Sequence, residues 1–341
     1  MTTTEFRTDP ITGRVVIVVP GRSARPNDHA AAPPSAPADP NCPFCEGNEG
    51  RTPPEVAVVA APGRAPNTRG WYVRTIPNRF PTVAAEDATS PAPLGTSLFT
   101  SGPAFGYHEV VIENPAHSPS LGFLPREQVL QALRMFRDRI RYLSELSRVG
   151  SVTLFENTGP ESGGSLWHPH AQLVTIPGVS PSLREEAEGA ERLRARSGSA
   201  CAFEEVSRAE VEDGRRVVVD SGRFTAFAPF ASAFPYETRV LPTRHARSFA
   251  SATDDEVEAL ADLLPSLLRA FLTVLPGASY NYVLRTPVTP TPEFDRYHWH
   301  LDLYPRLVRA DGFDLGSGLA VNTVLPEVVA DTLRTALAAK R

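Results

Sequence analysis

The chain has 341 residues, of which 41% are hydrophobic and 21% are charged, with a formal net charge of −5. These proportions are ordinary for a folded globular protein and exclude a disordered, collagen-like or coiled-coil chain. The sequence has no basic run, no signal-peptide layout and no apolar run near the roughly 20 residues that cross a bilayer. It therefore predicts a cytoplasmic protein with neither nucleic acid nor membrane as a partner.

Hydrophobic periodicity predicts both helices and strands. In chain order these are strands at 14–19, 72–77 and 107–113, a helix at 125–148, strands at 151–156 and 171–177, a helix at 182–196, strands at 215–220 and 236–242, a helix at 254–275, strands at 280–286 and 297–305, and a helix at 326–339. Ser182 is expected to open the helix at 182–196. Strands are about twice as frequent as helices, so we expect an α+β fold with mainly antiparallel sheets and packed helices.

Cysteines and histidines recur in the same order in the two parts of the chain. The first part has the motif CPFC, a lone histidine at His117, a helix, a strand and the motif HPHAQ. The second part has CAFE, a lone histidine at His245, a helix, a strand and HWHLD. This order predicts two copies of one α+β unit, over 1–195 and 196–341.

The CPFC motif places two thiols, Cys42 and Cys45, at the spacing of a metal-binding knuckle. This spacing suits tetrahedral zinc, which two imidazoles from elsewhere in the chain would complete. His117 and His168 are the candidates. The alternative is a reduced cysteine pair that binds nothing. A redox pair is disfavoured because the surrounding segment resembles a loop instead of the start of a helix.

The HPHAQ motif places His168, His170 and Gln172 on one side of a strand, because side chains alternate along it. Pro169 cannot donate to a strand ladder, so we expect this strand end at a sheet edge. The row alone is compatible with a structural histidine pair, with a metal held by both imidazoles, or with a nucleophilic histidine beside a ligand histidine. Upstream, Asn157 and a glycine turn at 163–165 offer polar groups and amides that could face a phosphate.

Together, the segments ENTGPESGGSLWHPHAQ, CPFCEGNE, NPAHSPSL and YHWHLDLYPRL resemble the galactose-1-phosphate uridylyltransferases and the related nucleoside-diphosphate-sugar phosphorylases, in the histidine-triad superfamily. The resemblance covers nearly the whole chain. It implies two tandem histidine-triad units, the first catalytic and the second degenerate. It also implies ping-pong transfer of a nucleoside monophosphate between a nucleotide sugar and a sugar 1-phosphate in galactose metabolism. The expected nucleotide is UMP.

The resemblance also implies a role for each candidate residue. His170 would be the nucleophile, and Gln172 would donate a hydrogen bond to the phosphoryl group. The nucleotide and phosphate would be bound by Asn157, Gly163, Ser165, Arg22, Arg25 and Asn78. Structural zinc would be held by Cys42, Cys45, His117 and His168. A homodimer is expected.

Three other functions compete with this interpretation. One is a phosphorylase that cleaves a nucleotide sugar or dinucleotide with inorganic phosphate. Another is a non-catalytic, zinc-stabilised nucleotide-binding protein, and the third is a metallohydrolase that uses the HPH pair directly.

The second copy departs from the family pattern. Its possible metal ligands are Cys201, Glu204, His245 and His298, and either a second zinc or a metal-free site is expected there. Arg285 stands where some relatives have a further metal-binding histidine. Because Asp302 follows His300 where the first copy has glutamine, the second copy should be a poor catalyst.

Overall fold

The computed structural model describes residues 4–24, 39–85, 98–99, 101–118, 120–288 and 292–339. It confirms the α+β class, with a ten-stranded sheet whose neighbouring strands are all antiparallel. In sheet order its strands are β3 (Ala57–Ala60), β4 (Trp71–Pro77), β5 (His108–Ile112), β7 (His170–Ile176), β6 (Ser151–Thr158), β11 (Tyr280–Arg285), β12 (His300–Pro305), β10 (Thr238–Pro242), β9 (Phe224–Phe227) and β8 (Val217–Asp220). A three-stranded sheet contains β1 (Glu5–Thr8), β2 (Val15–Val18) and β13 (Ala320–Asn322).

The large sheet has a repeated order about its central pair, β6 and β11. Outward from β6 lie β7, β5, β4 and β3, and outward from β11 lie β12, β10, β9 and β8. A long helix precedes each central strand in the chain, α1 (Arg126–Ser144) before β6 and α4 (Asp254–Val274) before β11. The division of the chain into units at 1–195 and 196–341 stays a prediction.

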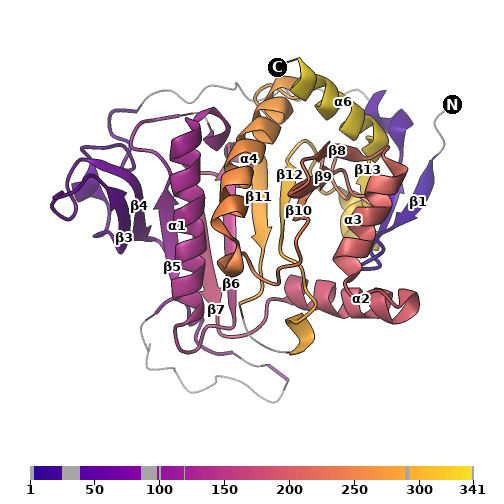
Figure 1. Ribbon diagram of the computed structural model, residues 1–341, viewed down its shortest axis with the longest axis horizontal. Helices are drawn as coiled ribbons and strands as arrows, with labels where there is room; N and C mark the ends of the chain where they lie inside the picture. The colour runs from indigo at the N-terminus through magenta and orange to yellow at the C-terminus, as the bar shows by residue number, and fades with distance from the viewer. Residues whose placement is uncertain are drawn as a thin grey trace.

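The helices α1 and α4 lie side by side over one face of the sheet (Figure 1). The apolar stripe predicted for α1 is buried: Val129, Leu133, Phe136, Ile140 and Leu143. A capping box between Thr253 and Glu256 starts α4. These helices and the facing strand residues form the main core.

Four shorter α-helices lie in the described part of the chain. They are α2 (Pro181–Ser197), α3 (Ala202–Asp213), α5 (Gly312–Ser317) and α6 (Pro326–Ala338). The side chain that caps α2 is Ser180, so the prediction that Ser182 opens this helix is wrong. Sequence periodicity missed α3 and α5 as well as the short strands β1, β3, β9 and β13. None of the described helices is both long and apolar enough to cross a membrane.

Strand β7 divides its side chains between two environments. Ala171 and Leu173 face the helices and belong to the main core, so His170 and Gln172 face the opposite side. The predicted edge position is wrong, because β7 lies between β5 and β6. Pro169 precedes the first strand residue, where a missing N–H breaks no ladder bond, and its carbonyl accepts from the amide of Glu113.

Candidate functional site

Four metal-ligand side chains converge where β7 begins. The Sγ of Cys42 lies 3.6 Å from Nδ1 of His168, and the Sγ of Cys45 lies 3.5 Å from Nδ1 of both His117 and His168. All four ligand atoms lie within 4.8 Å of one another, so the cluster can bind a metal ion. The structure thus brings together residues separated by up to 126 positions in the chain.

Hydrogen bonding and burial prepare His168 as a ligand. Its Nε2 lies 2.7 Å from the carbonyl oxygen of Asn114, which assigns the proton to Nε2 and leaves Nδ1 facing the sulfurs. Burial lowers the pKa of His168 to about 4, so its imidazole is neutral at pH 7. A neutral imidazole is the form that coordinates a metal.

His170 is held separately from the metal cluster. Its Nδ1 lies 2.6 Å from the carbonyl oxygen of His168 and donates to it, which leaves the lone pair on Nε2. Burial lowers the pKa of His170, so the neutral ring is favoured. The ring of Phe44, inside the CPFC motif, contacts the His170 ring at 5.0 Å between centroids. The cluster that can bind a metal includes His168 but not His170, which disfavours a metal held by both imidazoles.

Gln172 lies in a polar group on the same face of the sheet. Its Oε1 is 2.9 Å from Nε2 of His108 on β5 and 3.5 Å from Nδ2 of Asn78, just after β4. Asn78 is therefore placed beside Gln172, and its role in binding the nucleotide stays a prediction. No motif in the sequence marks His108 as a site residue.

Asn157 lies at the end of β6, beside the glycine turn. Asn281 of β11 donates from its Nδ2 to Oδ1 of Asn157 at 2.7 Å and to the carbonyl of Ser162 at 3.0 Å. Gly163 has a φ of +85°, a conformation that favours glycine. A Cβ on Gly163 would lie 3.8 Å from Nδ2 of Asn157, so the turn folds back over this side chain.

The sequence predicted that the backbone amides of this turn face a phosphate, but two of them are bonded within the turn. Those of Gly163 and Gly164 donate to the carbonyls of Pro160 and Gly159 within the turn. For the exposed Ser165, no backbone acceptor of its amide is found in the described part of the chain. Its amide and hydroxyl are thus the groups of this turn that are best placed to meet an anion.

The two predicted arginines have different outcomes. Arg22 is exposed and forms an ion pair with Asp311, 3.2 Å away at the start of α5. Its described contact is thus with the C-terminal segment instead of β6 or β7. Arg25 lies outside the described residues.

The second possible metal cluster is looser than the first. Cys201, Glu204, His245 and His298 again have ligand atoms within 4.8 Å of one another. The Sγ of Cys201 is 4.0 Å from Nδ1 of His298, and Oε1 of Glu204 is 3.4 Å from Nδ1 of His245. Burial lowers the pKa of His298 to about 3, as it does for its counterpart in the first cluster.

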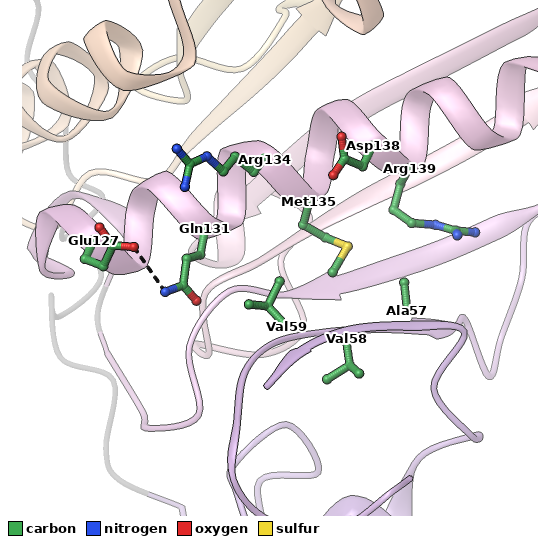
Figure 2. Close-up of a pocket in the computed structure, with 9 residues that line it drawn as sticks. All are labelled: Ala57, Val58, Val59, Glu127, Gln131, Arg134, Met135, Asp138 and Arg139. Atoms are coloured by element: carbon green, nitrogen blue, oxygen red, sulfur yellow. Dashed lines mark hydrogen bonds between the residues drawn. The ribbon is translucent and has the colours of Figure 1, made fainter. Parts of the chain in front are cut away.

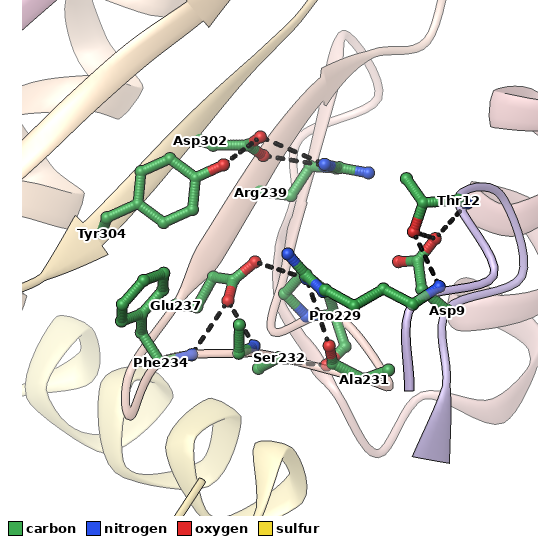
Figure 3. A network of polar contacts seen from close by, with 12 residues as sticks. Asp9, Thr12, Pro229, Ala231, Ser232, Phe234, Glu237, Arg239, Asp302 and Tyr304 are labelled. Atoms are coloured by element: carbon green, nitrogen blue, oxygen red, sulfur yellow. Dashed lines mark hydrogen bonds and ion pairs between the residues drawn. The ribbon is translucent and has the colours of Figure 1, made fainter. Parts of the chain in front are cut away.

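In the second copy, Asp302 stands at the position that corresponds to Gln172, and charged side chains surround it. Asp302 accepts from Nε of Arg239 at 2.7 Å and from the hydroxyl of Tyr304 at 2.9 Å, within the polar network of Figure 3. Glu186 and His300 lie close to Asp302, and the ligand atoms of these three residues lie within 4.8 Å of one another, close enough to hold a cation. However, Nε of Arg285 already lies 3.5 Å from Asp302, so positive charge is present there without a metal.

A separate groove of about 480 Å³ lies between β3 and α1, on the side of the molecule that the helices cover (Figure 2). Met135 and Val59 line it together with charged residues of α1. No predicted site residue lines this groove.

Comparison with known proteins places the chain among nucleotide-sugar enzymes. A family model described as galactose-1-phosphate uridyl transferase, N-terminal domain, matches residues 1–177. An ADP-glucose phosphorylase of Arabidopsis thaliana is 32% identical and matches over 97% of this chain and 92% of its own length. A galactose-1-phosphate uridylyltransferase of Thermotoga maritima is 28% identical over 97% of this chain and 98% of its own.

A solved structure agrees with these matches. It is the crystal structure of an ADP-glucose phosphorylase from Arabidopsis thaliana with bound ADP-glucose, at 29% identity and a TM-score of 0.82, covering 98% of both chains. The predicted enzyme class, a nucleotidyltransferase, is confirmed. The protein belongs to the galactose-1-phosphate uridylyltransferase family.

Proposed function

We propose that this protein transfers a nucleoside monophosphate between a nucleotide sugar and a sugar 1-phosphate through a covalent nucleotidyl-His170. UMP is the expected nucleotide. The observation that carries the proposal is the pair of hydrogen bonds around the HPHAQ strand. The bond from Nδ1 of His170 to the carbonyl of His168 leaves Nε2 free to attack. Gln172, with its carbonyl oxygen bound by His108, lies on the same face of β7.

The chemistry needs no proton transfer at His170. Nε2 attacks the α-phosphorus, the bond from that phosphorus to the bridging oxygen breaks, and the sugar 1-phosphate leaves with the bonding electrons. A second sugar 1-phosphate then attacks the phosphorus and returns the lone pair to Nε2. Because the lowered pKa of His170 keeps the imidazole neutral, the nucleophile is available at pH 7.

Neighbouring groups would bind the nucleotide during both steps. The amide of Gln172 would donate to a phosphoryl oxygen, and loss of one such donor costs on the order of 3 kcal/mol in transition-state stabilisation. Asn157, Gly163 and Ser165 would contact ribose and phosphate at the end of β6. Asn78 would lie beside the nucleotide. Arg22 and Arg25 stay predicted nucleotide-binding residues.

Zinc fits the first metal cluster. Tetrahedral zinc, with Zn–S of about 2.3 Å and Zn–N of about 2.0–2.1 Å, separates sulfur from nitrogen by about 3.5 Å. The separations from Sγ of Cys42 and of Cys45 to Nδ1 of His168 are 3.6 and 3.5 Å. Bound zinc would fix the residue that accepts the hydrogen bond of His170. The looser cluster at Cys201, Glu204, His245 and His298 is a possible second zinc site.

Inorganic phosphate is the second candidate acceptor, which would make the enzyme a phosphorylase. The specific observation in its favour is the likeness to the ADP-glucose phosphorylase of Arabidopsis thaliana, by sequence at 32% identity and by structure at a TM-score of 0.82. In both cases the first half-reaction is the same, because only the group that attacks nucleotidyl-His170 differs.

A homodimer in the cytoplasm also stays a prediction, and sedimentation would test its oligomeric state.

Intact-mass spectrometry after mixing with UDP-glucose, UDP-galactose, ADP-glucose or diadenosine polyphosphates tests the proposal. A nucleotide-sized increment that is present in the wild type and in His300→Ala, and absent in His170→Ala, would identify the donor. Adding glucose 1-phosphate, galactose 1-phosphate or inorganic phosphate should then remove the increment and identify the acceptor. No increment with any donor would favour a non-catalytic nucleotide-binding protein.

A further inference from the structure

His108 is a buried histidine whose side chain meets that of Gln172. Strand β5 pairs with β7 so that Val110 faces Gln172 and His108 faces Val174. His108 and Gln172 are therefore diagonal neighbours on one face of the sheet. His108 is 8% exposed, and its Nε2 lies 2.9 Å from Oε1 of Gln172.

The backbone determines which nitrogen of His108 carries the proton. The amide of Thr82 donates to Nδ1 at 3.0 Å, so Nδ1 must be an acceptor. Burial lowers the pKa of His108, against the opposing effect of its hydrogen bond to Gln172, so the ring is neutral at pH 7. A neutral imidazole with an accepting Nδ1 carries its proton on Nε2. His108 therefore donates to Gln172.

Asn78 restricts the same oxygen from another side. Its Oδ1 accepts from the amide of Phe80 at 2.8 Å, which leaves Nδ2 directed toward the His108–Gln172 pair. Nδ2 lies 3.5 Å from Oε1 of Gln172. It also lies 3.0 Å from Nε2 of His108, but both of these nitrogens are donors, so this approach is a contact and not a hydrogen bond. Two donors thus converge on Oε1 of Gln172.

From this arrangement we infer that His108 is a positioning residue that fixes the orientation of the Gln172 amide, so that its NH₂ group is presented to the phosphoryl oxygens of the nucleotide. The reverse orientation would place the NH₂ group against two donors and the carbonyl oxygen against a phosphoryl oxygen, which is repulsive on both sides. This inference rests on the proposed function of Gln172. It assigns His108 to the transferring site without contact with the substrate.

Two substitutions distinguish the hydrogen bond made by Nε2 of His108 from the one made by its Nδ1. In His108→Gln the amide nitrogen can occupy the place of Nε2 and keep the donor, whereas His108→Asn keeps a polar group near Nδ1 and loses that donor. We expect His108→Asn to slow formation of nucleotidyl-His170 by about 10-fold to 100-fold, as loss of a supporting hydrogen bond typically does. The loss should appear in kcat with little change in KM, because Gln172 acts on the transition state. His108→Gln should restore most of the rate.

A double-mutant cycle tests whether the effect passes through Gln172. In a Gln172→Ala background, His108→Asn should cause no further slowing, because the two residues act as one unit. Equal slowing in both backgrounds would overturn the inference, as would an unchanged rate in His108→Asn. If the wild type formed no adduct with any donor, the proposed function itself would fail and this role with it.

A measurement independent of activity uses the wild-type protein alone. Long-range proton–nitrogen NMR correlations of His108 should show a protonated Nε2 and an unprotonated Nδ1 at pH 7. A proton on Nδ1, or a doubly protonated ring, would overturn the inference even if the transferase activity were present.

Discussion

In both β7 and β12, a histidine is held by a hydrogen bond to the backbone carbonyl two residues before it. Only β7 leaves polar groups free for a substrate. Nδ1 of His170 bonds to the carbonyl of His168 at 2.6 Å, and Nδ1 of His300 bonds to the carbonyl of His298 at 3.0 Å. Two residues further on, the first strand has Gln172 and the second has Asp302. This difference, together with the charged neighbours of Asp302, changes the electrostatics of the site.

In the second copy, the charges neutralise one another. Burial alone would raise the pKa of Glu186, but His300 together with Arg285 and Arg239 lowers it to about 2. Asp302 is likewise held as a carboxylate, because Arg239 and His300 outweigh the effect of burial on its pKa. Helices α2 and α3 cover this face, in a cluster with side chains of β9 and β10. Glu186, Arg239, Arg285, His300 and Asp302 thus form a covered ionic cluster, called here the ionic core of the second copy.

In the first copy, the side chains that contact Gln172, those of His108 and Asn78, are neutral. Gln172 is bound by His108 and Asn78, which leaves its amide without a charged partner among its described contacts. The CPFC loop contacts His170 through Phe44. A site lined by neutral side chains can bind an anionic substrate without first breaking an ion pair. This difference predicts that His170, and not His300, forms the covalent intermediate.

The largest expected effect is on covalent transfer. We expect His170→Ala to lower kcat by about 10⁴-fold or more, since removing a nucleophile costs this much in enzymes with covalent intermediates. His300→Ala should keep nucleotidyl transfer within a few-fold per folded molecule, although loss of a buried ring lowers stability. Rapid-quench assays on both variants, normalised by active-site content, test the contrast. Comparable losses in the two variants would contradict it.

The next effect separates the two metal clusters. We expect His117→Ala to bind less zinc than the wild type and to have a free energy of unfolding lower by about 3 kcal/mol or more, because metal binding contributes directly to folding. His245→Ala should lose less, because the ligands of the second cluster lie further apart. Zinc per chain by elemental analysis and urea unfolding measure both. A larger effect from His245→Ala would reverse the assignment.

Metal affinity of the first cluster should also depend on pH. Burial, together with the neighbouring Cys42, raises the pKa of Cys45 to about 11 when no metal is bound, so its thiol is protonated at pH 7. Binding must then release that proton, and the affinity for zinc should increase from pH 6 to pH 8. Competition against a chelator at the two pH values measures this change. An affinity independent of pH would show that binding releases no thiol proton, which would contradict a ligand that is protonated at pH 7.

Much of the fold followed from local sequence. The stripe from Val129 to Leu143 predicted α1, and the spacing of Thr253 and Glu256 predicted the start of α4. These patterns are local, so they do not depend on the rest of the chain. The repeated cysteines and histidines likewise predicted which residues would form the two clusters.

Contacts set by strand register could not be predicted in this way. His108 meets Gln172 only because β5 pairs with β7, and Asn281 meets Asn157 only because β11 pairs with β6. No spacing along the chain encodes either pairing. The error at Pro169 has a related cause: a proline outside the first ladder bond is compatible with a central strand.

A smaller effect is expected where the ionic core of the second copy is broken. Asp302→Asn leaves the guanidinium groups of Arg239 and Arg285, whose side chains are 12% and 20% exposed, beside a neutral side chain, and we expect it to lower the free energy of unfolding by about 3 kcal/mol. The matched control is Glu191→Gln, which removes a carboxylate from the exposed pair with Arg194. Exposed pairs contribute at most about 1 kcal/mol, so the control should stay close to the wild type. Equal losses would show that burial of the pair is not decisive.

The smallest expected effect comes from carboxyl groups that the first copy buries without arginine. Glu156 accepts from the hydroxyl of Thr158 at 2.7 Å, and Glu113 accepts from the hydroxyl of Tyr282 at 3.1 Å. The second oxygen of each carboxyl group has no partner among the described residues. Burial raises the pKa of Glu156 to about 7 and that of Glu113 well above its usual range.

This shift gives Glu156 a defined effect on stability. Its usual pKa is 4.5, so between pH 4.5 and about 7 the folded chain holds more protons at this group than the unfolded chain, and stability falls as the pH rises. Glu156→Gln removes this loss, so its unfolding free energy relative to wild type should rise by about 2 kcal/mol from pH 5 to pH 8. Urea unfolding at each pH measures the difference, with the exposed Glu188→Gln as the control for a lost negative charge. A difference that stays constant over this range would mean that Glu156 is ionised in the folded protein, and the contrast between neutral and ionic buried carboxyl groups would then be wrong.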